Sequence, residues 1–239
     1  MHRPNFDQYR DQLRDVLSNR QPNTFPRHGP AAIDVADIFE QVNMDGSRVR
    51  TLTIQRTCSR CNQPSPALSL CLPTVIHPTM LPCSPDHQVT IPTPLTIQEW
   101  VDTLITTNTN FYGSGYDCHT CSVSTQVASS FQPTPFLHFE VPTEITSTIS
   151  PSQILIICNA NVISDHYLLR EIIYLGQLHF TARLITPNNT AWAYDGQVNM
   201  GIPIKDLCAI NNIHQLKTFQ GKQAYVYVYQ YIPHPPPQI

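Results

Sequence analysis

The sequence predicts an α+β fold, with helical segments mainly in the first half and strands mainly in the second. Apolar residues recur at helical spacing after Asn5 and again over 96–107, where Thr96 and Glu99 form a capping box. From Phe136 onward the chain is instead a succession of β-branched and aromatic segments. Together these patterns predict a helical part and a mixed or antiparallel sheet.

Two helices are expected near the start of the chain, one ending before Pro22 and a short one capped by Asp34. Residues 48–57 then alternate between two faces and predict a strand that runs directly into Cys58. A second alternating stretch begins at Leu68 and ends in a proline-rich segment, which predicts a loop before the capped helix.

The last predicted strand is the most regular of the second half. Four tyrosines at every second position share one face there, which we interpret as sheet core. A short proline-rich tail, 233–239, follows this strand. The predicted strands are 136–141, 154–159, 168–175, 180–186, 191–194 and 223–231.

Composition limits the classes of partner. The chain has 239 residues, 14 basic and 17 acidic, and a net charge of −3, so it lacks the basic excess that a nucleic-acid partner requires. Its apolar runs, such as Ile154 to Cys158, are far shorter than the roughly 18 residues of a membrane span. The first residues do not resemble a secretory signal. We therefore expect a cytoplasmic or nuclear protein that binds neither nucleic acid nor membrane.

Two Cys-x-x-Cys motifs are the sharpest chemical signal in the sequence. Cys58 and Cys61 form the first, and Cys118 and Cys121 form the second. Two such turns can supply the four thiolates of a tetrahedral zinc site. Four paired but buried thiols are the alternative, and a disulfide framework would compete only in a secreted protein. We predict a structural zinc ion.

The other four cysteines are isolated in the sequence. Cys158 and Cys208 lie in apolar contexts, which favours packing in the core. Cys71 and Cys83 carry no comparable signal. None of these four follows a Gly-Asn-like turn into a helix, the setting that makes a thiol reactive.

A histidine and an aspartate flank a predicted turn near the end of the chain. His179 opens one expected strand and Asp195 closes the next, with residues 187–190 between the strands. A carboxylate bound to one imidazole nitrogen would leave the other nitrogen to accept a proton from a thiol or hydroxyl. Spacing alone favours the alternative of a surface histidine and a turn-capping aspartate.

The chain resembles the ubiquitin-specific protease family of papain-like cysteine isopeptidases over most of 34–231. The order of the motifs, rather than any one of them, carries this resemblance. The segments concerned are Asp34 to Phe39, Cys58 to Cys61, Thr96 to Leu104, Tyr116 to Cys121, Pro135 to Glu140, Tyr167 to Tyr174, His179 to Ala182 and Trp192 to Asp195.

The resemblance implies a papain-like ubiquitin-hydrolase fold: a palm sheet, zinc-ribbon-like fingers and a truncated thumb. Residues 1–33 would be the thumb stub, 34–232 the fingers and palm, and 233–239 the tail. It also implies thiol-dependent cleavage of ubiquitin or a ubiquitin-like modifier from lysine by a monomer. His179 would be the general base, and Asp195 would orient its ring.

The resemblance breaks down at the nucleophile. In the family this cysteine lies upstream at the start of a helix, but residues 1–33 contain no cysteine. The chain would then be either part of an active enzyme or a catalytically dead relative that binds ubiquitin. A zinc-stapled interaction module without any connection to ubiquitin is a third hypothesis.

Overall fold

The fold of the described residues is mostly β-sheet. The computed structural model contains two α-helices and one short 3-10 helix in this part of the chain, and the rest of its regular structure is strand. Among these helices, none is long and apolar enough to cross a membrane. The structure describes residues 6–25, 27, 51–71, 95–113, 117–142, 149–158, 164–176, 179–198 and 202–233.

The chain divides into two compact units, Met1–Ser47 and Arg48–Ile239. In the first, helix α1 (Phe6–Arg20) ends two residues before Pro22, as predicted. Leu17 on this helix is buried. The short helix expected after Asp34 lies outside the described residues.

A three-stranded antiparallel sheet begins the second unit, with the strand order β2-β1-β4. Strand β1 (Thr51–Cys58) pairs over its full length with β4 (Thr125–Gln132), and on its other side with β2 (Leu68–Cys71). The sequence predicted β1 and β2 but not β4. Threonine, serine and glutamine dominate β4, so it carries little hydrophobic alternation, and its pairing with β1 fixes it as a strand.

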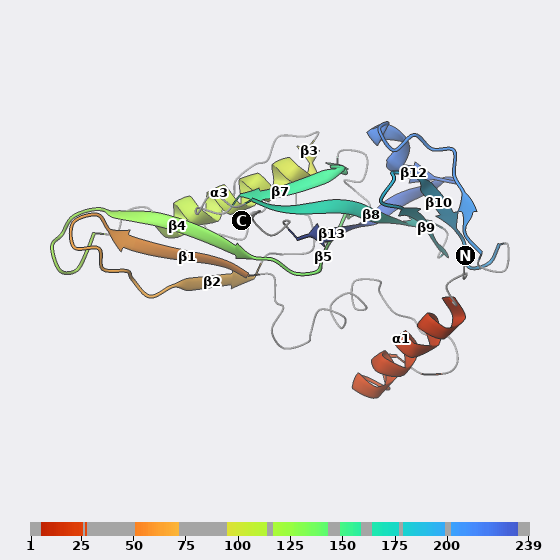
Figure 1. Ribbon diagram of the computed structural model, residues 1–239, viewed down its shortest axis with the longest axis horizontal. Helices are drawn as coiled ribbons and strands as arrows, with labels where there is room; N and C mark the ends of the chain where they lie inside the picture. The colour runs from red at the N-terminus through yellow and green to blue at the C-terminus, as the bar shows by residue number, and fades with distance from the viewer. Residues whose placement is uncertain are drawn as a thin grey trace, which may run out of the picture. The chain divides into compact units, whose positions relative to one another are not determined.

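An eight-stranded antiparallel sheet forms the larger part of this unit (Figure 1). Its continuous path is β11-β10-β9-β8-β13-β12, while β5 pairs with β13 and β7 with β8. Two-residue strands β3 (Leu95–Thr96) and β6 (Ile149–Ser150) form a separate parallel pair, and a 3-10 helix covers Ile213–Leu216. The eight strands are β5 Phe136–Glu140, β7 Ile154–Cys158, β8 Ser164–Gly176, β9 His179–Ile185, β10 Ala191–Tyr194, β11 Ile204–Lys205, β12 Thr218–Phe219 and β13 Lys222–Ile232.

The tyrosines of β13 follow the predicted alternation only in part. Tyr227 and Tyr229 are fully buried, and the Tyr229 ring lies edge-on to Phe139, with 5.8 Å between centroids. Tyr225 instead contacts Phe180, at a centroid distance of 6.1 Å, and is not in the core cluster. The register with β8 shifts at this point, because one extra residue of β13 forms a bulge. A bulge cannot be recognised from the alternation itself.

Helix α3 (Ile97–Gly113) joins the two sheets through one hydrophobic core. The capping box is confirmed: the Thr96 amide donates to Glu99 Oε2 at 2.7 Å and the Glu99 amide donates to Thr96 Oγ1 at 3.1 Å. Trp100 is buried and contacts the Phe139 ring edge-on at 5.9 Å. Figure 1 shows the helix running beside both β4 and β7.

The outer edge of β7 is covered by the side chain of Gln98 on α3. The Ile156 amide donates to Gln98 Oε1 at 2.8 Å, and Gln98 Nε2 donates to the Ile156 carbonyl at 2.9 Å. The side-chain amide thus takes the place that a neighbouring strand would occupy. It satisfies an edge that would otherwise be available to another chain.

We predict that Gln98→Ala lowers the free energy of unfolding by about 1–2 kcal/mol, because it removes both partners of the Ile156 backbone. Urea denaturation would measure the change. The control is Gln126→Ala on the exposed side of β4, which should change stability by less than about 0.5 kcal/mol. Equal effects of the two substitutions would contradict the role assigned to Gln98.

Glu171 is a half-buried acid in the middle of the eight-stranded sheet. It lies on β8 between Val228 of β13 and Leu184 of β9. Burial raises the pKa of its carboxyl to about 7. The native state therefore holds a proton that the unfolded chain releases near its ordinary pKa of about 4.3.

Because the folded state binds this proton more tightly, the contribution of Glu171 to stability falls as pH rises from about 4 to about 7. We predict that Glu171→Gln unfolds at a higher temperature than the wild type at about pH 8.5, and that this difference largely disappears at about pH 4. Calorimetry at the two pH values tests this. A gain in melting temperature of the same size at both values would show that the charge is not its cause.

Candidate metal centre and histidine–aspartate pair

The first Cys-x-x-Cys motif forms a tight turn at the end of β1. The Asn62 amide donates to the Cys58 carbonyl at 2.9 Å, and the Cys58 amide donates to the Gln63 carbonyl at 3.1 Å. The amide of Arg60 points at Cys58 Sγ, 3.4 Å away. Asn62 has a φ of 52°, a left-handed conformation that asparagine tolerates well.

The second motif repeats this geometry just before β4. The Ser122 amide donates to the Cys118 carbonyl at 2.8 Å, and the Cys118 amide donates to the Val123 carbonyl at 2.9 Å. The Thr120 amide lies 3.4 Å from Cys118 Sγ, and Ser122 has a φ of 53°. Serine adopts this left-handed conformation less readily than asparagine does. The two turns therefore have the same backbone hydrogen bonds and orient their sulfurs in the same way.

The four sulfurs of these turns converge on one point. Cys58 and Cys121 are 3.3 Å apart at their Sγ atoms, Cys61 and Cys118 are 3.5 Å apart, and all four sulfurs lie within 4.8 Å of one another. A tetrahedral zinc site with Zn–S bonds of about 2.3 Å needs sulfurs about 3.8 Å apart. The residues present fit a structural zinc ion, which would be enclosed by four protein ligands.

Backbone amides prepare two of the four thiols for metal binding. Amides of Cys61 and Arg60 lower the pKa of Cys58 to about 6, and amides of Thr120 and Cys121 lower the pKa of Cys118. The second thiol of each turn has a raised pKa. For Cys61, the Cys58 side chain is the main cause. Metal binding would therefore release protons from these thiols.

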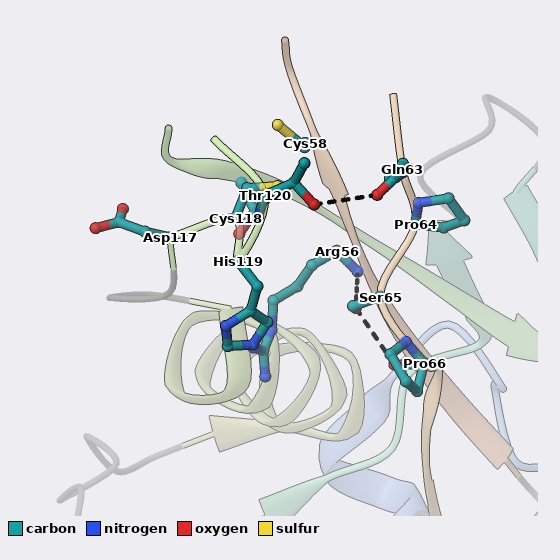
Figure 2. A pocket seen from close by; sticks show the side chains of 11 residues that line it. Arg56, Cys58, Gln63, Pro64, Ser65, Pro66, Asp117, Cys118, His119 and Thr120 are labelled. Carbon is teal, nitrogen blue, oxygen red and sulfur yellow. Dashed lines mark hydrogen bonds between the residues drawn. The ribbon is translucent and has the colours of Figure 1, made fainter. Parts of the chain in front are cut away.

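A cavity of about 350 Å³ lies beside the two turns (Figure 2). Figure 2 shows Arg56, Asp117 and His119 among the residues that line this cavity, with the Asp117 carboxylate pointing away from the other two. Thr120 Oγ1 donates to Gln63 Oε1 across the turns at 3.3 Å.

The prediction for Cys158 is wrong. Its side chain is exposed, because it lies on the outward face of β7 next to Ser164. Cys208 is half-buried and packs against the edge of the core, with its Sγ 3.7 Å from Gln215 Oε1. The side chains of Cys71 and Cys83 lie outside the described part of the chain. In the residues that are described, no hydrogen bond joins His179 to a cysteine.

The structure brings His179 and Asp195 together at one end of the large sheet. His179 opens β9 and Asp195 directly follows β10, and these adjacent strands place His179 Nε2 2.8 Å from Asp195 Oδ1. The His179 side chain is 25% exposed and that of Asp195 is 14% exposed. An ionised carboxylate can only accept, so Nε2 carries the proton and Nδ1 is left for another partner.

The turn after β10 holds the Asp195 carboxylate in place. The Gln197 amide donates to Asp195 Oδ1 at 2.9 Å, and the Val198 amide donates to the Asp195 carbonyl at 3.1 Å. The Gln197 amide is the main cause of the lowered pKa of Asp195, and the bond to His179 adds to it. The carboxylate is therefore ionised at neutral pH. Sequence reasoning missed Gln197, because a backbone donor leaves no signal in residue type.

Comparisons with known proteins give structural likeness only. No family model and no curated protein matches the sequence. Two solved structures of the SAGA DUB module Ubp8/Sgf11/Sus1/Sgf73 match it at 13% identity. The match to one of them, bound to monoubiquitin, has a TM-score of 0.48 and covers 92% of the present chain and 52% of the solved chain. The match to the other has a TM-score of 0.45 and covers 95% of the present chain and 48% of the solved chain.

A yeast SAGA DUB module structure matches at 12% identity and a TM-score of 0.39, covering 95% of this chain and 50% of that chain. The chain thus spans about half the length of the solved chains that it resembles. A functional assignment therefore depends on the two sites in the chain itself, the four cysteines and the histidine–aspartate pair.

We predict that purified protein contains about one zinc per chain and that Cys58→Ser and Cys118→Ser lose it. Both substitutions should also lower the melting temperature, because zinc binds the folded chain far better than the unfolded one. Elemental analysis and thermal melts provide the measurements. Cys158→Ser, at an exposed cysteine outside the cluster, is the matched control and should retain metal. Absence of zinc from the wild type would exclude a structural zinc site.

Proposed function

We propose that this chain is the fingers and palm of a ubiquitin-specific-protease-like architecture. The three-stranded sheet with its cysteine turns would be the fingers, and the eight-stranded sheet would be the palm. Residues 1–33 would be the remnant of a thumb, 34–232 the fingers and palm, and 233–239 a proline-rich tail. In the intact architecture, the reaction would be thiol-dependent cleavage of ubiquitin, or a ubiquitin-like modifier, from lysine.

The contact between His179 and Asp195 is the observation that carries this proposal. Their 2.8 Å bond uses Nε2, so Nδ1 is the nitrogen that would take a proton from a thiol and return it to the leaving amine. Asp195 would hold the ring in the required tautomer and stabilise the imidazolium. This arrangement is a base and its orienting acid without the nucleophile.

The metal centre would support this function without taking part in the chemistry. Cys58, Cys61, Cys118 and Cys121 would hold a structural Zn²⁺ that closes the far end of the β1–β4 ladder. The ion would keep this extension rigid enough to hold a globular partner. Four protein ligands leave no open coordination position for a substrate.

A ubiquitin-binding protein without catalysis is the second candidate function, and a zinc-stapled scaffold with no link to ubiquitin is the third. Residues 1–33 contain no cysteine, which is compatible with part of an active enzyme and with a catalytically dead binding protein. An NMR titration with labelled ubiquitin separates the second candidate from the third. Only a scaffold unrelated to ubiquitin should leave the ubiquitin spectrum unchanged.

We predict that the chain does not hydrolyse a ubiquitin–aminocoumarin reporter above background and is not labelled by ubiquitin vinyl sulfone. Loss of the nucleophile of a catalytic triad lowers kcat by about a millionfold, so little activity would remain. Labelling that maps to Cys71, Cys83, Cys158 or Cys208 would instead show that the nucleophile is present in this chain.

The catalytic roles can be tested by supplying an upstream segment that carries a cysteine at the start of a helix. Restored activity should be abolished by His179→Ala and reduced by up to about 10⁴-fold by Asp195→Asn, since the amide favours the wrong tautomer. His214→Ala, at an exposed histidine in the 3-10 helix, is the control and should leave activity unchanged.

A further inference from the structure

Arg183 is a buried cation on the same strand as His179. It is 7% exposed and lies four residues further along β9, where the register with both neighbouring strands is unbroken. Side chains alternate along a strand, so His179 and Arg183 share one face of β9. A buried guanidinium is costly unless it is paired and hydrogen-bonded.

The guanidinium of Arg183 has polar partners in four other segments, which it contacts through Nε and Nη1. Its Nε lies 2.7 Å from Asp206 Oδ2, directly after β11. Burial acts to lower the pKa of Arg183, but Tyr174 and Asp206 raise it by more, so the charge is retained. Its Nη1, which carries two hydrogens, lies within hydrogen-bond distance of three oxygens: the Tyr174 hydroxyl at 3.1 Å, the Gln215 carbonyl at 2.6 Å and the Thr218 carbonyl at 3.1 Å.

Small residues on β10 allow Arg183 to reach Asp206. Ala193 pairs with Arg183 across the two strands, and on its other side it pairs with Ile204 of β11. Ala191 and Ala193 are both buried, at 2% and 8% exposure. A longer side chain on this face of β10 would compete with the guanidinium for the same space.

Asp195 directly follows β10 and Asp206 directly follows β11, and these two strands form one hairpin. Strands β10 and β11 share two residue pairs, and one more bond joins the Asp206 amide to the Ala191 carbonyl at 3.0 Å. So short an outer strand opens readily unless other contacts hold it. Strand β9 contacts both arms through an ion pair, His179 with Asp195 and Arg183 with Asp206.

We propose that Arg183 is a positioning residue for the His179–Asp195 pair. By binding Asp206 to β9, it holds the β10–β11 hairpin so that the Asp195 carboxylate stays within hydrogen-bond distance of His179 Nε2. The catalytic meaning of this role rests on the proposed function. The geometric role does not, and it can be measured in this chain without any ubiquitin.

The test follows the Nε2–H proton of His179 by NMR, because the bond to Asp195 protects it from exchange with water. Arg183→Met removes the charge at similar length. Asp206→Asn removes the partner charge but keeps the oxygen that accepts from the Cys208 amide. In both variants we expect exchange to accelerate on the order of tenfold or more, as expected when a charge-assisted hydrogen bond is lost. The Asp195 pKa should also rise toward its ordinary value.

The matched control is Arg170→Met, because Arg170 is a β8 arginine bound to Gln230 rather than to the hairpin. Its Nε2–H exchange should equal that of the wild type. If Arg183→Met does not fold, Asp206→Asn decides the question. In Arg183→Ala, millimolar guanidinium should restore protection by filling the vacated site. Unchanged exchange in folded Asp206→Asn, or equal acceleration in Arg170→Met, would overturn the proposal. Failure to bind ubiquitin would leave this result unaffected.

Discussion

The antiparallel pairing of β8 with β13 is the interaction on which the rest of the second unit depends. These are the two longest strands, and β7, β9 and β5 each pair with one of them. Their inward side chains, including Tyr227 and Tyr229, form the core that α3 closes through Trp100. Both edges of this ladder therefore have partners, and the strand that carries His179 extends directly from it.

The two candidate sites lie at different places relative to these sheets. The histidine–aspartate pair lies where adjacent strands of the large sheet end. The pairing of β9 with β10 brings Asp195 near His179, and the contacts of Asp195 and of the hairpin hold it there. The cysteine cluster lies at the far end of a narrow three-stranded extension, where little apolar surface is available. A metal ion would supply there the stability that burial cannot.

Few residues of this protein are charged, and two of its buried or half-buried charged side chains are accommodated in different ways. Only 13% of residues are charged, yet Arg183 is buried with Asp206, and Glu171 lies half-buried in the centre of the sheet. The first is compensated by the ion pair with Asp206 and by three further hydrogen-bond contacts. The second is accommodated by a raised pKa, so that it need not carry a charge near neutrality.

The sequence by itself determined those features whose signal is local. Thr96 and Glu99 marked the start of α3, the paired cysteine spacing marked the four-cysteine cluster, and β-branched alternation marked most strands of the large sheet. Tertiary structure decided what depends on a distant partner. Strand β4 is polar and becomes a strand through pairing with β1, a bulge moves Tyr225 out of the core cluster, and Cys158 faces outward. Arg183 has a role only because folding places Asp206 beside it, and residue type cannot reveal a contact that the backbone register creates.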